Sequence, residues 1–546
     1  MASEKLSGGK PAILRFLISL RFALVETPRW LLLAAVVYAP WAYGCTRWWT
    51  KTLLIQSLLA ITLLWLCSLF LRRRWPRVSV PAVVLALSLL GLGWLSVFNS
   101  LATYDELAQV FSPVSQPLQG WLGSWDAEFA RRAMLLVTAL TGAFLISMDF
   151  AANPVWRTRL FFTLALSGGL LLVLGLAQRA GGAPGIFWEA SAPKGNFFAT
   201  YVNHSNAGAF INLTLPIVAG QTILAFQNTK GQFARALWSF LLIVSVTALF
   251  VNTSRASMVI GLVIIGALVI GTIVFAVRRR PPLLGTREGG EQRRQRAGKR
   301  EVHPGHREAY PQRFVTEGRL PRPRVLATAA VVLVCTLILI LSFGIERSLE
   351  RWNHTLNSLF VSDDGAPSEG RVSIYRICWL SLPAAGWFGF GPGTFSIVFP
   401  FLQQEHGGEL NGILRYAHQD YLQTILEWGV IGFVLWAVLI GGGIVRAIFQ
   451  LREATRAITR EPAMWLALSA LSLIGALIHG LVDFPLQIAS LQLIFAVLLG
   501  QLWADLYVDR QRTRSIRLGT YASLRSNRAN REGSGKACPP HEQWRE

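Results

Sequence analysis

Apolar residues recur along the chain in long runs, and short polar or basic segments separate one run from the next. A helix of about 20 apolar residues is long enough to cross the hydrocarbon core of a bilayer, which is ~30 Å thick. The pattern therefore predicts an all-α, polytopic membrane protein with about twelve transmembrane helices. From the runs and their flanks, we expect spans at 30–47, 52–71, 78–98, 133–150, 160–178, 207–226, 236–253, 257–277, 325–343, 421–445, 463–481 and 487–505.

The composition agrees with a membrane protein. Hydrophobic residues make up 52% of the 546 positions and charged residues only 15%, against about 25% charged residues in soluble domains. The cysteines are few and scattered, so they form neither a disulfide framework nor a CxxC metal motif. They are Cys45, Cys67, Cys335, Cys378 and Cys538.

The positive charge of the chain lies mainly in alternate loops. Lys and Arg number 52 and Asp and Glu 30, which gives a net charge of +22. Of these, 40 basic and 15 acidic residues lie in alternate segments, so one side of the membrane carries +25 and the remainder −3. Basic loops face the cytoplasm, so both termini are expected there, and the charge gives no support for a nucleic-acid partner. The basic segments are 1–29, 72–77, 149–159, 227–235, 278–324, 446–461 and 505–546.

The same reading divides the chain into five regions. An amphipathic cytoplasmic N-terminus at 1–29 precedes the N-terminal spans at 30–235. The core at 236–445 contains a basic cytoplasmic insert at 278–324, expected to be a linker, and a long outer loop at 344–420. The C-terminal spans at 446–506 and a basic cytoplasmic tail at 507–546 complete the chain. Because loops as long as 344–420 are usually functional, this segment is expected to carry functional residues.

Polar side chains converge at the predicted outer ends of the spans. Arg255 and Arg371 are permanent cations whose forked donors suit phosphate oxygens. His418 is of the residue type that takes a proton near neutral pH. This set would suit attack by a sugar hydroxyl on a lipid-pyrophosphate-linked glycan, with the arginines stabilising the leaving group and the histidine accepting the proton. Secondary candidates are Arg415, His204, Tyr416, Glu427, His479 and Asp483.

Structural interpretations compete with these roles. An arginine at a span end often only anchors the helix at the interface, as we expect for Arg376. Glu427 is expected to be a packing or hydrogen-bonded partner rather than an acid catalyst. The glycine-rich stretch Gly389–Phe395 lacks the lysine of a P-loop and is read as a tight turn that dips to the membrane. Four aromatic residues are then expected at the interface: Trp387, Phe388, Phe390 and Phe395.

Two further function classes were weighed. Metal-dependent transfer would need ligands such as the outward acidic pairs Asp105-Glu106 and Asp363-Asp364, which we expect to be solvated loop residues. No metal or cofactor is therefore expected. A transporter of small anions such as bicarbonate would need ionisable groups or broken helices at mid-bilayer, and Glu427 is the only clear carboxylate inside a predicted span.

At these residues the sequence resembles the O-antigen ligase and O-antigen polymerase superfamily. The matching pieces follow the family's order: Ser254-Arg255-Ala256-Ser257, then Gly370-Arg371, the Gly389–Phe395 turn, and His418-Gln419 followed at its proper spacing by Gly429 and Gly432. The block from His479 to Pro485 and the Asn-His region at Tyr201–Asn206 also resemble the corresponding parts of the family. The resemblance covers about 240–490, and the basic insert at 278–324 is longer than expected for the family.

The resemblance implies a fold of the membrane-embedded glycosyltransferase type called GT-C and a role in lipopolysaccharide or other cell-envelope polysaccharide biosynthesis. The implied donor is an undecaprenyl-pyrophosphate-linked glycan, and the acceptor is lipid A-core or another glycan or protein. Arg255 and Arg371 would bind the pyrophosphate and His418 would activate the acceptor, without a metal, at the periplasmic face of the bacterial inner membrane. A polymerase and a protein O-oligosaccharyltransferase remain open as alternatives.

Overall fold

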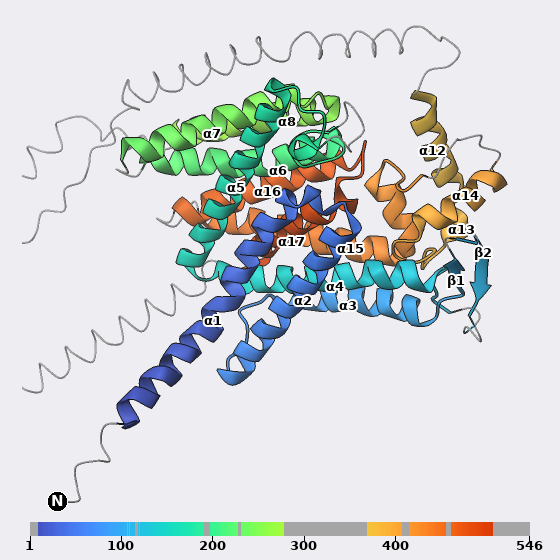
Figure 1. The fold of residues 1–546 in the computed structure, drawn as a ribbon, viewed down its shortest axis with the longest axis horizontal. Coiled ribbons are helices and arrows are strands. Elements are labelled where there is room, and N and C mark those ends of the chain that lie inside the picture. The colour runs from blue at the N-terminus through green and yellow to red at the C-terminus, as the bar shows by residue number, and fades with distance from the viewer. Residues whose placement is uncertain are drawn as a thin grey trace, which may run out of the picture. The chain divides into compact units, whose positions relative to one another are not determined.

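The computed structural model describes residues 9–105, 107–108, 110–114, 118, 121–189, 197–227, 231–277, 368–406, 414–454 and 460–505. Helices dominate these ranges (Figure 1), which confirms the all-α prediction. The predicted span at 325–343, the basic insert at 278–324 and the tail at 507–546 lie outside the described residues, as do Glu106 and the pair Asp363-Asp364.

Within the described ranges, nine helices are long and apolar enough to cross a membrane, and each coincides with a predicted span. They are α2 Trp48–Leu71, α3 Val80–Phe98, α4 Ala127–Ala151, α5 Pro154–Ala180, α6 His204–Gln227, α7 Gln232–Val251, α8 Arg255–Val277, α15 Asp420–Ala454 and α16 Arg460–His479. The first predicted span falls in α1, which runs continuously from Gly9 to Trp41, and the last is the shorter apolar helix α17, Ala489–Trp503.

Smaller elements join these helices. The segment 344–420, which the sequence predicted as a long outer loop, contains three helices in its described part, α12 Ser368–Leu380, α13 Leu382–Ala385 and α14 Phe395–Glu405. A two-stranded antiparallel sheet joins β1 Ala102–Asp105 to β2 Val110–Pro113, with Tyr104 opposite Phe111. Three short 3-10 turns complete the set, η1 Tyr43–Cys45, η2 Ile186–Trp188 and η3 Pro485–Gln487.

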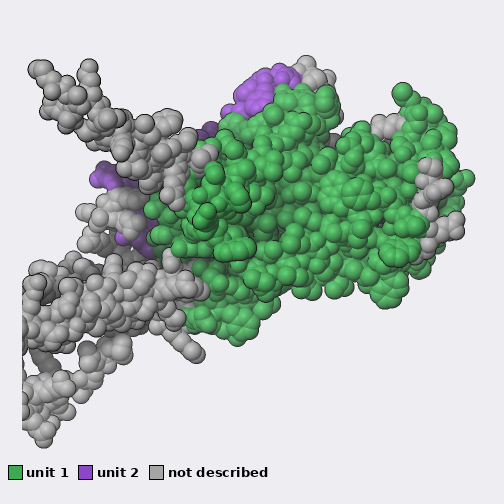
Figure 2. All heavy atoms as spheres, turned by 90° about the horizontal axis from the view of Figure 1, so that it is seen from below, with its two compact units in different colours: residues 1–163, 370–473, 486–546 green, residues 164–369, 474–485 purple. Residues whose placement is uncertain are grey.

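The chain forms two compact units, which Figure 2 distinguishes by colour. Unit 1 comprises residues 1–163, 370–473 and 486–546, and unit 2 comprises 164–369 and 474–485. The boundaries therefore fall inside α5, near the start of α12, inside α16 and inside η3. Each unit is described by itself below.

In unit 1, α4 packs against α2, α3 and α17, and α15 packs against α3 and α17. The contact between α4 and α17 is close because Gly500 lacks a side chain: a Cβ there would lie 2.6 Å from the carbonyl oxygen of Phe144. Buried polar groups also join the two helices, since Ser147 donates to the carbonyl of Val497 at 2.7 Å. The scaffold that holds α15 is thus joined by both close packing and hydrogen bonds.

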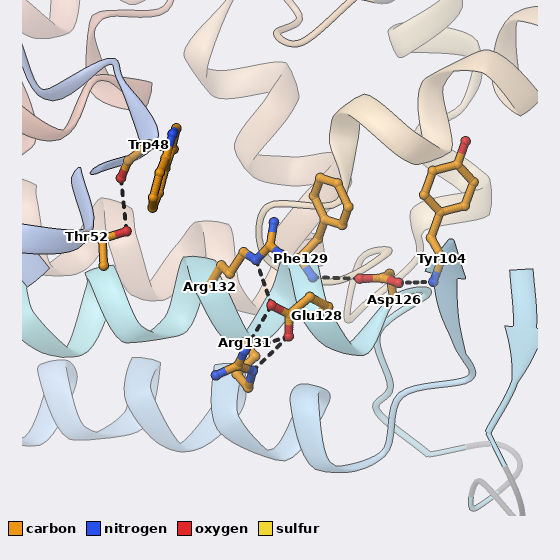
Figure 3. A network of polar contacts seen from close by, with 8 residues as sticks. All are labelled: Trp48, Thr52, Tyr104, Asp126, Glu128, Phe129, Arg131 and Arg132. Carbon is orange, nitrogen blue, oxygen red and sulfur yellow. Dashed lines mark hydrogen bonds and ion pairs between the residues drawn. The ribbon is translucent and has the colours of Figure 1, made fainter. Parts of the chain in front are cut away.

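The start of α4 is anchored by a buried carboxylate (Figure 3). Asp126 precedes the helix, and its side chain accepts hydrogen bonds from the backbone N–H groups of Phe129, at 2.6 Å, and of Tyr104 in β1. Such an N-cap satisfies a donor that the first turn of a helix leaves unpaired. In the first turn of α4, Glu128 accepts from Arg131 and Arg132. Asp126 therefore ties the hairpin to the same end of unit 1 that carries α12, α13 and α14 (Figure 1).

In unit 2, α6 is the central helix and packs against α7 and α8. Small and polar residues allow a close approach at one end of α6. A Cβ on Gly208 would lie 2.4 Å from the Cβ of Ser257 and 2.9 Å from the amide nitrogen of Asn252. One turn further along α6, Asn212 donates to the carbonyl of Ser257 at 3.1 Å. These contacts fix the turn between α7 and α8, the turn that leads into Arg255.

Candidate functional site

The predicted site residues fall into two sets, one in each unit. Unit 1 holds Arg371, Arg415, Tyr416, His418 and Glu427, and unit 2 holds His204, Arg255, His479 and Asp483. The geometry of each set follows from the elements that carry it.

Arg371 lies in the first turn of the described part of α12, on an exposed face of that helix. The opposite face is apolar, and Ile374, Ile377 and Cys378 are buried in a cluster with residues of α14 and α15. This spacing of three and four residues is that of an amphipathic helix. Because residues four apart share a face, Arg371 stands one turn from Tyr375.

Tyr375 connects α12 to the segment that carries His418. Its hydroxyl donates to the backbone carbonyl oxygen of His418 at 2.6 Å. His418 is half-buried and has a backbone φ of 54°, in the left-handed region that residues other than glycine seldom adopt. Such a conformation persists only where the surrounding contacts impose it. The hydrogen bond from Tyr375 is one of these contacts, so unit 1 brings the Arg371 helix and His418 together.

The residues that follow His418 start and anchor α15. The side-chain oxygen of Gln419 accepts from the N–H of Leu422 at 2.5 Å, which caps the helix. The buried Asp420 accepts from the N–H of Leu486 at 3.0 Å and from the amide of Gln487 at 3.2 Å. The His-Gln-Asp sequence therefore supplies a candidate base, a helix cap and an anchor at three consecutive positions.

Tyr416 and Arg415 precede this turn and differ in exposure. Arg415 is exposed and Tyr416 is partly buried. Burial raises the pKa of the Tyr416 phenol above its ordinary value of 10.0, although the neighbouring Arg415 acts in the opposite direction. Tyr416 is thus protonated at neutral pH.

α15 is interrupted at Gly429. The φ and ψ of this residue are 64° and −174°, a combination that is essentially restricted to glycine. The interruption leaves backbone groups of the helix without their usual partners. The glycine-rich turn supplies these partners: Phe390 and Gly391 donate to the carbonyls of Leu426 and Glu427, at 2.8 and 3.0 Å.

Hydrogen bonds in the opposite direction, from N–H groups of α15 to carbonyls just before the glycine-rich turn, complete the junction. The N–H groups of Val430 and Ile431 donate to the carbonyls of Gly386 and Trp387, at 3.3 and 3.1 Å. This contact is backbone against backbone, because a Cβ on Gly389 would lie 2.5 Å from the carbonyl oxygen of Glu427. The turn is therefore built into the interrupted helix. Irregular backbone in a membrane protein is tolerated where protein covers it in this way.

The aromatic residues of this turn only partly match the prediction. Trp387 and Phe388 are exposed, as interface residues would be, but Phe390 and Phe395 are buried in the core of unit 1. Phe390 packs edge-on against Trp125, with 5.3 Å between ring centroids. The prediction that all four lie at the membrane interface is wrong for these two, because interface and core aromatics give the same sequence signal.

Glu427 lies in the first piece of α15 and is buried. Its carboxylate accepts hydrogen bonds from the N–H of Gly393 at 2.9 Å, the N–H of Phe395 at 3.4 Å and the amide of Gln423 at 3.0 Å. Lys51, at the start of α2, interacts with it electrostatically. The expectation that Glu427 is a hydrogen-bonded partner agrees with this arrangement.

In unit 2, His479 and Asp483 are buried at the end of α16. The Nε2 of His479 lies 3.2 Å from the hydroxyl of Ser205, the second residue of α6. Asp483 donates its backbone N–H to the carbonyl of His479 at 3.1 Å and accepts from the N–H of Phe484. His204, the first residue of α6, is half-buried. These residues therefore join α16 to the start of α6.

Arg255 begins α8 directly after the turn that Thr253 makes with a φ of 63°. Ser254 is buried before it, and its hydroxyl accepts from the N–H of Ser257 at 3.4 Å. The half-buried Arg255 thus projects from a rigid helix start in unit 2.

Three residues of unit 1 were not predicted as functional. Tyr375 lies one helical turn after Arg371, and Gln423 lies one turn before Glu427. This spacing of four residues was the sequence signal that could have identified both. Lys51 was visible as a basic residue within the first positions of an apolar run. Among the described residues, no group of three or more His, Cys, Asp or Glu is arranged to hold a metal ion. Asp105 instead accepts from the N–H groups of Leu107 and Ala108.

The O-antigen ligase family model matches residues 231–437. This region includes Arg255, Arg371, His418 and Glu427, and it confirms the resemblance drawn from the sequence: over these residues the chain is similar to O-antigen ligases. No curated protein matches the chain. The spanning helices indicate a multi-pass membrane protein, and the family match makes residues 231–437 similar to enzymes of the O-antigen ligase or polymerase type. Enzymes of this type use a lipid-linked glycan donor and a glycan acceptor.

Proposed function

We propose that the protein transfers a glycan from undecaprenyl pyrophosphate to an acceptor hydroxyl at the periplasmic face of the inner membrane, with lipid A-core as the first candidate acceptor. The observation that carries the proposal is the hydrogen bond from Tyr375 to the carbonyl of His418. This hydrogen bond connects α12, which carries Arg371, to the segment in which His418 has a constrained backbone conformation.

His418 acts as the general base in this proposal. It accepts the proton of the acceptor hydroxyl while the oxygen attacks the anomeric carbon of the donor sugar, and the bond from that carbon to the pyrophosphate breaks. Arg371 binds the pyrophosphate and stabilises the charge that grows on it as the leaving group. Arg255 is the second proposed pyrophosphate ligand, on the strength of the family resemblance. The reaction requires no metal or other cofactor, because the arginines provide the cationic charge.

The charge distribution supports the proposed orientation. The basic loops predicted to face the cytoplasm carry +25, whereas the spans and the remaining loops, which hold His418 and both arginines, carry −3. The positive-inside rule then assigns these three residues to the periplasmic side.

Alanine variants of His418 and Arg371 test the proposal, with transfer from an undecaprenyl-pyrophosphate-linked glycan to lipid A-core as the assay. Loss of the general base His418 should lower kcat by about 10²–10⁴-fold. Loss of Arg371 should mainly weaken binding of the donor. Matched controls on the same elements are Arg376→Ala, exposed on α12, and His406→Ala, after α14. Unchanged turnover in both His418→Ala and Arg371→Ala would rule out the proposed mechanism. Full activity in a chelator tests metal independence.

The products identify the acceptor. One transferred glycan per lipid A-core indicates a ligase, a ladder of repeats a polymerase, and a glycosylated polypeptide a protein O-oligosaccharyltransferase. Flux of a labelled anion such as bicarbonate into proteoliposomes, with no glycan transfer, would instead establish a transporter.

A further inference from the structure

We propose that Glu427 is a positioning residue for His418 and that it acts through Gln423 and the glycine-rich turn. The inference rests on the proposed function, since it concerns the base of that reaction. Glu427 contacts neither substrate nor reacting atoms in this proposal. It determines where the His418 segment lies.

The first step is the set of hydrogen bonds around the carboxylate. Glu427 is 6% exposed and faces three donors: the N–H groups of Gly393 and Phe395 in the glycine-rich turn, and the side-chain amide of Gln423. Gly393 donates to one carboxylate oxygen and Phe395 and Gln423 donate to the other, so both oxygens act as acceptors, as in an ionised carboxylate. Lys51 supplies a nearby positive charge. The carboxylate therefore joins α15 to the turn.

The second step leads from Glu427 to His418. Gln423 uses both ends of its amide, because its nitrogen donates to Glu427 and its oxygen accepts from the N–H of Ala417 at 3.1 Å. Ala417 is fully buried and immediately precedes His418. On the other side, Tyr375 holds the carbonyl of His418 at 2.6 Å. Two hydrogen bonds thus hold the left-handed backbone of His418, one from Tyr375 to its carbonyl and one from the preceding Ala417 to Gln423. Glu427 orients Gln423.

The third step concerns the charge. An amide at position 427 has one oxygen where the carboxylate has two, so its NH2 group would face either the N–H of Gly393 or the donors of Phe395 and Gln423. In the first case the glycine-rich turn would shift, and in the second Gln423 would shift and Ala417 would lose its acceptor. A displacement of about 1 Å at a catalytic group can cost about 100-fold in rate. Because the effect passes through the base and not through donor contacts, we expect it in kcat and not in the donor KM.

The principal variant is Glu427→Gln in the full-length protein in nanodiscs, with Glu405→Gln at the exposed end of α14 as the matched control. We expect kcat to fall about 100-fold with an unchanged donor KM, while the control keeps wild-type values. Backbone amide hydrogen exchange of peptides that contain Ala417 and Gly393 should become faster in Glu427→Gln. This second measurement does not depend on activity.

A swapped double variant, Gln423→Glu with Glu427→Gln, tests the hydrogen-bond route. The new carboxylate at 423 can accept from Ala417 and from the amide of residue 427, whose oxygen can accept from Gly393. We therefore expect the double variant to recover kcat by about tenfold or more over Glu427→Gln. Recovery would not follow if residue 427 acted directly on the substrate, because the charge has moved by one helical turn.

Gln423→Met keeps the inference testable if Glu427→Gln does not fold. It removes both hydrogen bonds of the Gln423 amide, to Ala417 and to Glu427, and leaves the bonds from Gly393 and Phe395 to Glu427 intact. Wild-type kcat in Gln423→Met, or in a folded Glu427→Gln with faster exchange, overturns the inference even when His418→Ala is inactive. If His418→Ala keeps full turnover, the proposed function itself fails, and the exchange measurement still reports whether Glu427 orders the turn.

Discussion

Replacing Gly429 by alanine should destabilise unit 1 strongly, because this position combines an unusual backbone conformation with a close contact. The φ of 64° and ψ of −174° cost a residue with a side chain about 1–3 kcal/mol. The added Cβ would lie 2.3 Å from the carbonyl oxygen of Trp387 and 2.4 Å from the nitrogen of Phe388. Both are backbone atoms that cannot rotate away, so the glycine-rich turn must move.

The cost of that movement follows from the hydrogen bonds it breaks. The four backbone hydrogen bonds between residues 386–391 and 426–431 contribute about 1 kcal/mol each. With loss of two to four of them, the strain and the broken bonds together amount to about 3–7 kcal/mol. An entropy of unfolding of about 2.1 cal/mol/K per residue corresponds to about 0.9 °C per kcal/mol for a chain of this length, so the midpoint of thermal unfolding should fall by about 3–6 °C.

Thermal unfolding of the purified protein in detergent measures this effect. Gly441→Ala is the matched control on the same helix, because no atom lies within 4 Å of the Cβ it would add. Alanine is the better helix former there by about 1 kcal/mol, so the control should keep or raise the midpoint. A Gly429→Ala protein that melts within about 1 °C of the wild type would refute the reasoning, since no strain of the expected size could then be present.

Three other outcomes are expected from the structure. Asp126→Ala removes the buried cap of α4 and its bond to β1 and should cost about 1–2 kcal/mol in thermal unfolding, whereas Asp105→Ala, on the exposed hairpin, should cost less. Gly208→Ala should destabilise unit 2 by about 1–3 kcal/mol, because its Cβ would lie 2.4 Å from that of Ser257, while Gly266→Ala, with no atom within 4 Å, should not. Burial holds the pKa of Tyr416 above 10.0 in the folded state, so its stabilising contribution is present below pH 10 and is lost as the pH rises through the folded value. Tyr416→Phe should therefore show a flatter loss of stability above that pH, and identical pH profiles for both proteins would contradict the assigned burial.

The membrane helices could be predicted from the sequence because the signal for each is local. Run length and hydropathy located α3 at 78–98, and the structure has it at Val80–Phe98. The helices of the outer segment gave a weaker signal. α12 is only 13 residues long and has an amphipathic pattern, so an apolar window does not detect it.

The sequence predicted only part of the candidate site. Residue type and predicted side selected Arg371 and His418, and helical spacing could have added Gln423, four residues before Glu427. The burial of Phe390 could not be predicted, because an aromatic residue in a glycine-rich turn suits a membrane interface and a protein core equally well.

The sequence by itself determined the class of protein, the positions of the described spans and the residue types available for chemistry, since hydropathy and charge act over one helix or one loop. Only the tertiary structure decided which backbone groups meet. Gly393 donates to Glu427 at a sequence separation of 34 positions, and Tyr375 donates to His418 at a separation of 43. Hydrogen bonds of this kind depend on which segments pack side by side, and no local period carries that information.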